Sequence, residues 1–185
     1  MKPSLTTLRD QSQFVLVDVQ ERLAGVMLPD AMAAVAKNCA ILLQAAKLLE
    51  IPTIYTEQYP QGLGATLGDL SAHLSAQQRV EKIVFSCAKE PTFTRKLTSD
   101  RPQIVLAGME AHICVLQTAL DLQQSGHQVF VAEDAVISRN PSNKANALER
   151  LRKASIIISN TESIVFEWLG SAEGDAFKQI SKLVR

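Results

Sequence analysis

The stretch QFVLVD, residues 13–18, holds a run of apolar side chains that is bounded by a glutamine and an acid. A strand with one solvated face alternates apolar and polar residues, whereas a continuous apolar run suits a strand that is buried on both faces, as in a parallel sheet. The stretch QIVLAG, residues 103–108, repeats the pattern and ends in a glycine. We therefore expect these two stretches to be strands of a parallel sheet.

Further apolar runs and helical patterns alternate along the chain. Strands are expected at residues 13–18, 52–56, 79–86, 103–107, 128–132 and 155–159. Helices are expected at residues 30–50 (with Asp30 as N-cap), 91–97, 113–125, 142–154, 162–169 and 173–183. The alternation, without repeats or a linker, predicts a three-layer, doubly wound α/β fold. In this Rossmann-like arrangement a six-stranded parallel sheet carries helices on both faces, as one domain over residues 1–185.

Polar side chains follow the ends of several predicted strands. Asp18 closes the first strand, and Glu57 and Gln58 follow the second. Lys82 lies in the third strand and Cys114 follows the fourth. Ligands of open α/β sheets bind outside the carboxyl ends of the strands. We therefore expect an acid, a lysine and a thiol to converge on one crevice.

Cys114 stands where a helix is about to begin. The unpaired N–H groups and the positive dipole end of a helix start favour thiolate over thiol, and a nearby ammonium group would favour it further. The pKa of Cys114 is therefore expected below the usual value of about 8.5. A small apolar residue buried at a helix start would look the same in the sequence, so position alone leaves both interpretations open.

The composition restricts the classes of partner. Nineteen basic and nineteen acidic residues cancel, which gives no electrostatic footprint for nucleic acid or an anionic membrane. The N-terminal stretch lacks the apolar core of a signal peptide, and no apolar run is expected to reach the length of a membrane span. Three unclustered cysteines argue against a disulfide framework. We expect a soluble cytoplasmic protein that acts on a small molecule.

Three motifs give the chain a family resemblance. LVDVQ around Asp18, EKIVFS around Lys82 and GMEAHICV around Cys114 resemble the isochorismatase-like hydrolases, also called the cysteine hydrolase superfamily. The likeness extends over nearly the whole chain and includes YTEQYPQGLG, EDAVISR and SNTES. It implies the isochorismatase-like hydrolase fold, and it places the family's Asp–Lys–Cys triad on Asp18, Lys82 and Cys114.

The resemblance also implies a mechanism. Asp18 would take the proton of Cys114, whose sulfur would attack a carbonyl carbon of a small amide, ester or related acyl compound. Asp18 would then activate water for hydrolysis of the covalent intermediate while Lys82 holds charge. Backbone N–H groups of residues 108–114 would receive the oxyanion. The alternatives are an isochorismatase-type cleavage of an enol ether, which needs no thiol, and a binding or regulatory protein without turnover.

Departures from the family pattern bear on metals. Nicotinamidases, which are metal-binding relatives, carry histidines after the second strand, where this chain reads EQYPQGLG. Because His73, His112 and His127 are scattered, we expect neither a metal nor another cofactor. Ala111 stands where many relatives have threonine or serine, so one polar contact in the cysteine loop is missing.

The remaining candidates are contacts to substrate. Glu110, Ala111 and His112 lie in the loop before the cysteine, and a Cys–His dyad with His112 is disfavoured by their adjacency. The other expected contacts are Glu57, Gln58 and Phe85, although solvation or core packing would also account for them.

Two further expectations concern the cysteines and the association state. Cys39 is expected in the core, and Cys87 is expected at most to border the pocket. The terminal helices (residues 162–169 and 173–183) offer more apolar surface than one end of a sheet needs, so a homo-oligomer is expected. The alternative is that these residues simply cover the sheet.

The last expectation concerns the backbone before the nucleophile. Relatives have a cis peptide bond at this place, and residues 108–114 keep the matching spacing. We therefore expect a cis bond between Met109 and Glu110, neither of which is proline. Its effect would be to turn backbone N–H groups toward the oxyanion.

Overall fold

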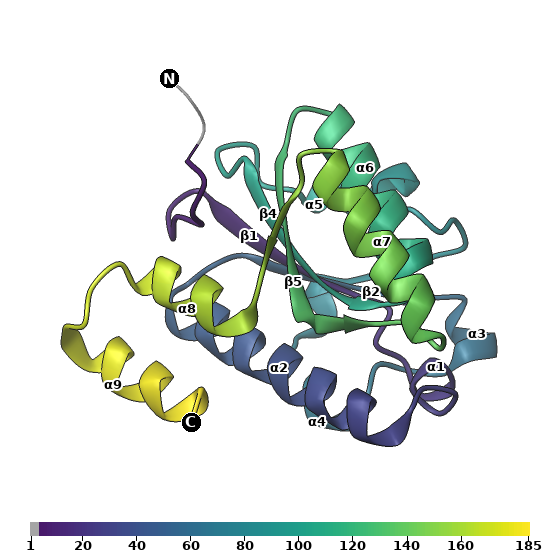
Figure 1. Ribbon diagram of the computed structural model, residues 1–185, viewed down its shortest axis with the longest axis horizontal. Coiled ribbons are helices and arrows are strands. Elements are labelled where there is room, and N and C mark those ends of the chain that lie inside the picture. Colours follow the sequence, from purple (N-terminus) through teal and green to yellow (C-terminus); the bar gives the residue numbers. More distant parts are fainter. Residues whose placement is uncertain (1–3) are drawn as a thin grey trace.

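The computed structural model describes residues 4–185, which are built around one parallel sheet (Figure 1). The sheet has six strands in the order β3-β2-β1-β4-β5-β6, and every neighbouring pair is parallel. The strands are β1 (Ser12–Val17), β2 (Thr53–Gln58), β3 (Arg79–Lys82), β4 (Gln103–Met109), β5 (Gln128–Ile137) and β6 (Ile157–Ser159). The predicted doubly wound α/β class is confirmed.

The two apolar runs form the centre of this sheet. β1 and β4 lie side by side and are buried at every position, because helices cover both faces and neighbouring strands cover both edges. Val17 pairs with Gly108 at the carboxyl end. A Cβ atom on Gly108 would lie 2.0 Å from the carbonyl oxygen of Val17, and φ there is +119°, so only glycine fits.

Helices cover both faces of the sheet, as predicted. One face carries α2 (Pro29–Leu48), α8 (Thr161–Leu169) and α9 (Gly174–Leu183), and the other carries α5 (Pro91–Lys96), α6 (Leu116–Gln124) and α7 (Pro141–Lys153) (Figure 1). Each set packs on its own apolar cluster. Short helical turns complete the chain: α1 (Glu21–Ala24), α3 (Pro60–Leu63), α4 (Gly68–Ser71), the 3₁₀ turns η1 (Ala76–Gln78) and η2 (Cys87–Lys89), and the π-helical turn η3 (Ala111–Val115).

Helix α2 corrects two expectations. By length and composition it is apolar enough to cross a membrane, contrary to the prediction, yet its buried face (which includes Cys39 and Leu42) packs on the sheet as a core helix does. Its N-cap is Leu28, and Pro29 takes the first helical position. Asp30 therefore lies in the first turn, where its charge faces the positive end of the helix, and it is not the N-cap.

The predicted third strand is too long. β3 ends at Lys82, because the carbonyl groups that follow it turn inward instead of continuing the ladder. The carbonyl of Ile83 accepts a hydrogen bond from the side chain of Gln58, and those of Val84 and Phe85 face the Lys82 ammonium group. β3 is an edge strand, so no strand on its outer side holds the backbone extended.

The terminal helices do not leave the surplus apolar surface that the sequence predicts. Ile164, Val165, Trp168 and Ile180 are buried within the chain itself. Phe166 packs edge-to-face on Phe177, with ring centroids 6.3 Å apart. These helices therefore cover the sheet, and their composition no longer supports self-association.

Candidate active site

Asp18 is the first residue after β1, and its backbone is bent sharply. Its φ of +50° lies in the left-handed region, which non-glycine residues seldom adopt. The backbone N–H of Asp18 still donates to the carbonyl of Thr56 in β2, 3.1 Å away, so the residue stays attached to the sheet. The side chain is fully buried. A carboxylate in this position needs partners within the protein, because water does not reach it.

Lys82, the last residue of β3, supplies the opposite charge. Its ammonium nitrogen lies 2.6 Å from Asp18 Oδ2, and neither side chain is exposed. Its other polar neighbours are Gln58 Oε1 at 2.7 Å, the carbonyl oxygens of Phe85 and Val84 at 3.2 and 3.3 Å, and Cys114 Sγ at 3.7 Å. Burial acts to lower the pKa of Lys82, but Asp18, followed by the two nearby thiols, outweighs it and raises that pKa. Lys82 is therefore a fixed cation.

Cys114 lies in the π-helical turn η3, immediately before α6. The prediction that its pKa falls below the usual value is wrong: burial, and then the negative charge of Asp18, raise the pKa of the Cys114 thiol, and Lys82 opposes them only in part. The reason is geometric, because the ammonium group sits 2.6 Å from the carboxylate and 3.7 Å from the sulfur. At rest the site holds a carboxylate, an ammonium group and a neutral thiol.

Thr56 is a member of this site that the sequence analysis missed. Its hydroxyl donates to Asp18 Oδ1 over 2.6 Å, and the Cys87 sulfur lies 3.8 Å from the same hydroxyl. All three side chains are buried. The signal that was available is the alternation of β2, since Thr56 and Gln58 point to one side of the strand and both face the Asp18–Lys82 pair.

The same alternation removes Glu57 from the site. Its Oε1 accepts from the backbone N–H and the hydroxyl of Thr66, at 2.7 and 2.8 Å, and its Oε2 lies 2.7 Å from Nε of Arg79. The carboxylate is occupied on the opposite face of β2 from the triad. These partners do not favour Glu57 as a substrate contact, whereas Gln58 is held beside Lys82. Both substrate contacts stay predictions.

Two candidates in the cysteine loop are tied to the segment after β5. Glu110 accepts from the backbone N–H of Arg139 at 2.9 Å and also pairs with its guanidinium group at 3.2 Å. His112 uses both ring nitrogens, Nδ1 with Ser138 Oγ at 2.9 Å and Nε2 with Asn143 Nδ2 at 3.3 Å. Because Asn143 donates, Nε2 accepts and Nδ1 carries the proton. His112 is thus oriented by the loop's neighbours, which agrees with the argument against a Cys–His dyad.

The other two candidates differ in their exposure. Ala111 is buried and packs in the same apolar cluster as Cys114, so its side chain is a support for the loop. Phe85 is 54% exposed and lies next to the carbonyl groups that face Lys82. Phe85 as a substrate contact stays a prediction. The peptide bond between Met109 and Glu110 is cis, as predicted.

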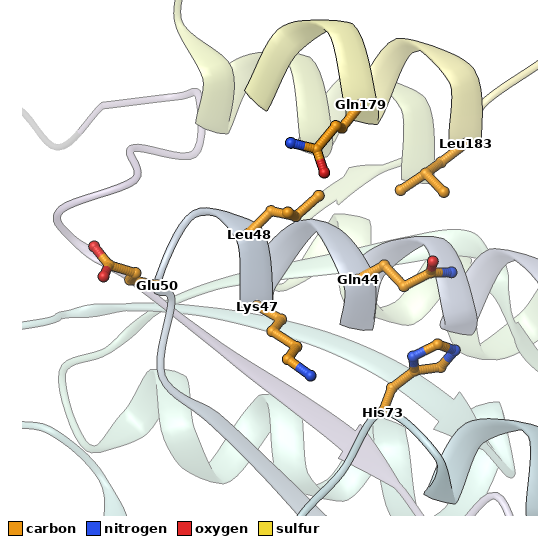
Figure 2. A pocket seen from close by; sticks show the side chains of 7 residues that line it. All are labelled: Gln44, Lys47, Leu48, Glu50, His73, Gln179 and Leu183. Carbon is orange, nitrogen blue, oxygen red and sulfur yellow. The ribbon is translucent and has the colours of Figure 1, made fainter. Parts of the chain in front are cut away.

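Two cavities lie at different distances from the triad. A cavity of about 570 Å³ is formed mainly by α2 and α9 near the amino end of β2, and Figure 2 shows Gln179 and Leu183 above Leu48, with Gln44, Lys47 and His73 below. No member of the triad lines it. A cavity of about 270 Å³ at the edge of the sheet has Lys82 in its wall, together with Pro60, Gln61, Glu81, Ile83, Val84 and Glu90. Of Asp18, Lys82 and Cys114, Lys82 is the residue that lines the smaller cavity.

The structure offers no clustered ligands for a metal within its described part. Over residues 4–185 there is no group of three or more histidine, cysteine, aspartate or glutamate side chains that is arranged to hold a metal ion. In His112 both ring nitrogens already have partners.

Comparisons with known proteins agree with this fold. The family model described as "Isochorismatase domain" matches residues 12–163. Isochorismatase domain-containing protein 2 of Bos taurus is 39% identical over 188 aligned positions, which cover 100% of this chain and 88% of that protein. A structure of the MAR1 ribonuclease of Caenorhabditis elegans superimposes with a TM-score of 0.90 at 32% identity, over 97% of this chain and 92% of that one.

A more distant structure shows the fold alone. The YcaC protein of Escherichia coli, described as an octameric hydrolase of unknown specificity, has a TM-score of 0.89 at 21% identity, over 99% of this chain and 92% of that one. The family model covers the sheet together with Asp18, Lys82 and Cys114. The chain belongs to the isochorismatase family.

Proposed function

We propose that this protein is a cysteine hydrolase that cleaves a small amide, ester or related acyl compound. The observation that carries the proposal is the contact set of Lys82, whose ammonium nitrogen lies 2.6 Å from Asp18 and 3.7 Å from the Cys114 sulfur in a buried pocket. A nucleophile, a base and a fixed positive charge within reach of one another are the parts that acyl transfer needs.

The first step is acylation. As the sulfur of Cys114 attacks the carbonyl carbon, its proton passes to Asp18, a C–S bond forms and the carbonyl oxygen takes the negative charge. The oxyanion would be met by backbone N–H groups of residues 108–114. The carbonyl then re-forms, the bond to the leaving nitrogen or oxygen breaks, and Asp18 returns the proton to that atom. The neutral resting thiol agrees with a sulfur that loses its proton only when substrate arrives.

The second step is hydrolysis of the thioester. Asp18, again a carboxylate, takes a proton from water as the water oxygen attacks the carbonyl carbon. The C–S bond breaks, and the proton on Asp18 returns to the sulfur, which restores the resting state. Lys82 is positive at rest beside the Asp18 carboxylate, and it would balance that charge whenever Asp18 is ionised during the reaction. The cavity of about 270 Å³ that borders Lys82 is consistent with a small substrate.

The decisive experiment is intact-mass spectrometry of the protein with a panel of small amides and esters. A covalent acyl adduct on Cys114 that is absent from Cys114→Ala supports the proposal. Turnover of an enol ether that survives Cys114→Ala would instead favour the isochorismatase-type reaction. Absence of both adducts and turnover across the panel would favour a binding protein.

Neither nucleic acid nor membrane enters this proposal. The relative from Caenorhabditis elegans is described as a ribonuclease, but the formal net charge of this chain is zero, which supplies no counterpart for a phosphate backbone. The cytoplasmic location stays a prediction from the sequence. Self-association is proposed by likeness to the octameric YcaC protein, and a monomer mass by light scattering at micromolar concentration would contradict it.

A further inference from the structure

The Thr56 hydroxyl lies between two buried side chains, the carboxylate of Asp18 and the thiol of Cys87. Only Asp18 takes part in the proposed mechanism. Asp18 Oδ1 accepts a hydrogen bond from this hydroxyl over 2.6 Å, because an ionised carboxylate has no hydrogen to donate. On the other side lies Cys87 Sγ, at 3.8 Å. Burial raises the pKa of Cys87 to about 11, so its S–H is intact and can donate to Thr56. The hydroxyl is therefore oriented toward Asp18.

Asp18 and Cys114 together hold one proton beside Lys82. Placing it on the sulfur leaves the charge on Asp18, and placing it on Asp18 leaves the charge on the sulfur. The titratable groups that face this pair are Lys82 from β3 and Cys87 from η2. Lys82 touches both acids, at 2.6 and 3.7 Å, and so stabilises either arrangement.

Thr56, in contrast, acts on one of the two groups that share this proton, because it is hydrogen-bonded to Asp18. Among the hydrogen bonds of the described residues, its hydroxyl reaches Asp18 and Cys87 but not Cys114. A hydrogen bond to an ionised acceptor favours that ionised form, here the carboxylate. The donor from Thr56 thus favours the arrangement in which the charge is on Asp18 and the proton is on the sulfur.

We propose that Thr56 is a positioning residue that keeps the shared proton on Cys114 at rest and holds Asp18 in place as the base for hydrolysis of the thioester. The part of this inference that concerns thioester hydrolysis rests on the proposed function, whereas the part that concerns the resting thiol does not. Without the hydroxyl the Cys114 thiolate becomes more populated, whereas the carboxylate that must take a proton from water loses the hydrogen bond that orients it.

The first test needs no substrate. Iodoacetamide alkylates a thiolate by forming a C–S bond as iodide leaves, so its rate at Cys114 reports the thiolate population. Thr56→Val removes the hydroxyl and keeps the shape. We expect alkylation near pH 7 to be roughly tenfold faster, because a hydrogen bond to a charged group is worth at least about one pH unit. Thr56→Ser, which keeps the hydroxyl, should stay near the wild type.

The second test separates the two steps. p-Nitrophenyl acetate acylates a thiol with release of nitrophenolate, and the acetyl-enzyme must then be hydrolysed. Thr56→Val should retain the initial burst but show a steady-state rate roughly tenfold lower, with acetyl-enzyme accumulating in the mass spectrum. Thr53→Val is the matched control, since Thr53 lies on the same strand and its hydroxyl donates to the carbonyl of Ile51, away from Asp18.

The outcomes are distinguishable. Slower alkylation of folded Thr56→Val would overturn the inference, because a structural defect slows both steps. An unchanged alkylation rate would overturn it as well. If the wild type forms no acetyl-enzyme, the proposed function loses support for esters of this kind, while the alkylation experiment still decides the role of Thr56.

Discussion

Two buried carboxylates, Asp18 and Glu57, each pair with a basic side chain of β3, and their surroundings differ. The Asp18–Lys82 pair is fully buried, and its cation also faces the Cys114 sulfur. The Glu57 carboxylate is nearly as buried, but Arg79 is 37% exposed. Thr66 donates two further hydrogen bonds to Glu57. One pair is placed to exchange a proton with a third group, and the other holds the loop after α3 in position. Burial and an ion pair alone do not separate a reactive site from a structural one.

The largest difference between the pairs should appear in stability. Lys82→Met leaves the buried carboxylate of Asp18 without its cation, and we expect the free energy of unfolding to fall by about 3–5 kcal/mol. Arg79→Met should lower it by about 1 kcal/mol or less, because the guanidinium group is partly solvated and Glu57 keeps its bonds from Thr66. Urea unfolding of both variants measures this. Equal losses of unfolding free energy in the two variants would show that the two ion pairs do not differ in this way.

Alkaline pH should destabilise the folded protein through its thiols. Burial raises the pKa of Cys39 to about 12, that of Cys87 to about 11 and that of Cys114 further. An unfolded chain loses these protons above about pH 9 while the folded chain keeps them, so the unfolded state then binds fewer protons and stability falls as pH rises. The free energy of unfolding is expected to fall by about 1.4 kcal/mol per pH unit for each thiol.

The control for the alkaline effect is Cys39→Ala compared with the wild type. Substitution should reduce the slope of unfolding free energy between pH 9 and 11 by about one thiol's share. Urea titrations at fixed pH values supply both slopes, and a wild-type stability that is flat over this window would refute the assignment.

Asp18 and Glu57 should also differ in their effect on the Cys114 thiol. Asp18→Asn removes the negative charge that helps to keep the Cys114 proton in place, so alkylation by iodoacetamide near pH 7 should accelerate by about tenfold or more. Glu57→Gln should leave that rate unchanged, because its carboxylate lies on the other side of β2. Peptide mapping of the labelled cysteines measures both, and acceleration by Glu57→Gln would return that residue to the site.

The smallest effect is expected at His112. His112→Leu breaks its contacts with Ser138 and Asn143, which should lower stability by about 1 kcal/mol. The pH dependence of Cys114 alkylation should keep its wild-type form. A changed pH dependence in this variant would show that His112 is the base and that the Asp18 assignment is wrong.

The sequence was sufficient for the sheet and for the meeting of Asp18, Lys82 and Cys114 beside it. Continuous apolar runs such as residues 13–18 occur where both faces of a strand are covered, and a parallel sheet then brings the residues after its strands to one edge. The sequence alone did not exclude Glu57, because its partner Thr66 comes from a loop that returns to β2 by a path no local pattern encodes.

Other features depend on distances that only the folded chain sets. The pKa of Cys114 was predicted in the wrong direction because a helix start and a lysine were counted. Burial of the thiol, and then the negative charge of the Asp18 carboxylate that engages the same lysine more closely, were not counted. β3 was drawn too long because its last residue is a lysine whose ammonium group is coordinated by the following carbonyls. Thr56 was missed because threonine is common in strands for packing reasons alone.

The inward carbonyls after β3 leave the side chains of Ile83, Val84 and Phe85 pointing outward and exposed. Main-chain coordination of Lys82 is indifferent to the identity of these three residues, so their side chains can be exchanged while the chemistry beside them is conserved. In evolutionary terms, the side chains at this rim can change while the carbonyl contacts to Lys82 are kept. In engineering terms, a library at these positions would test whether the rim sets the substrate range of the proposed hydrolase.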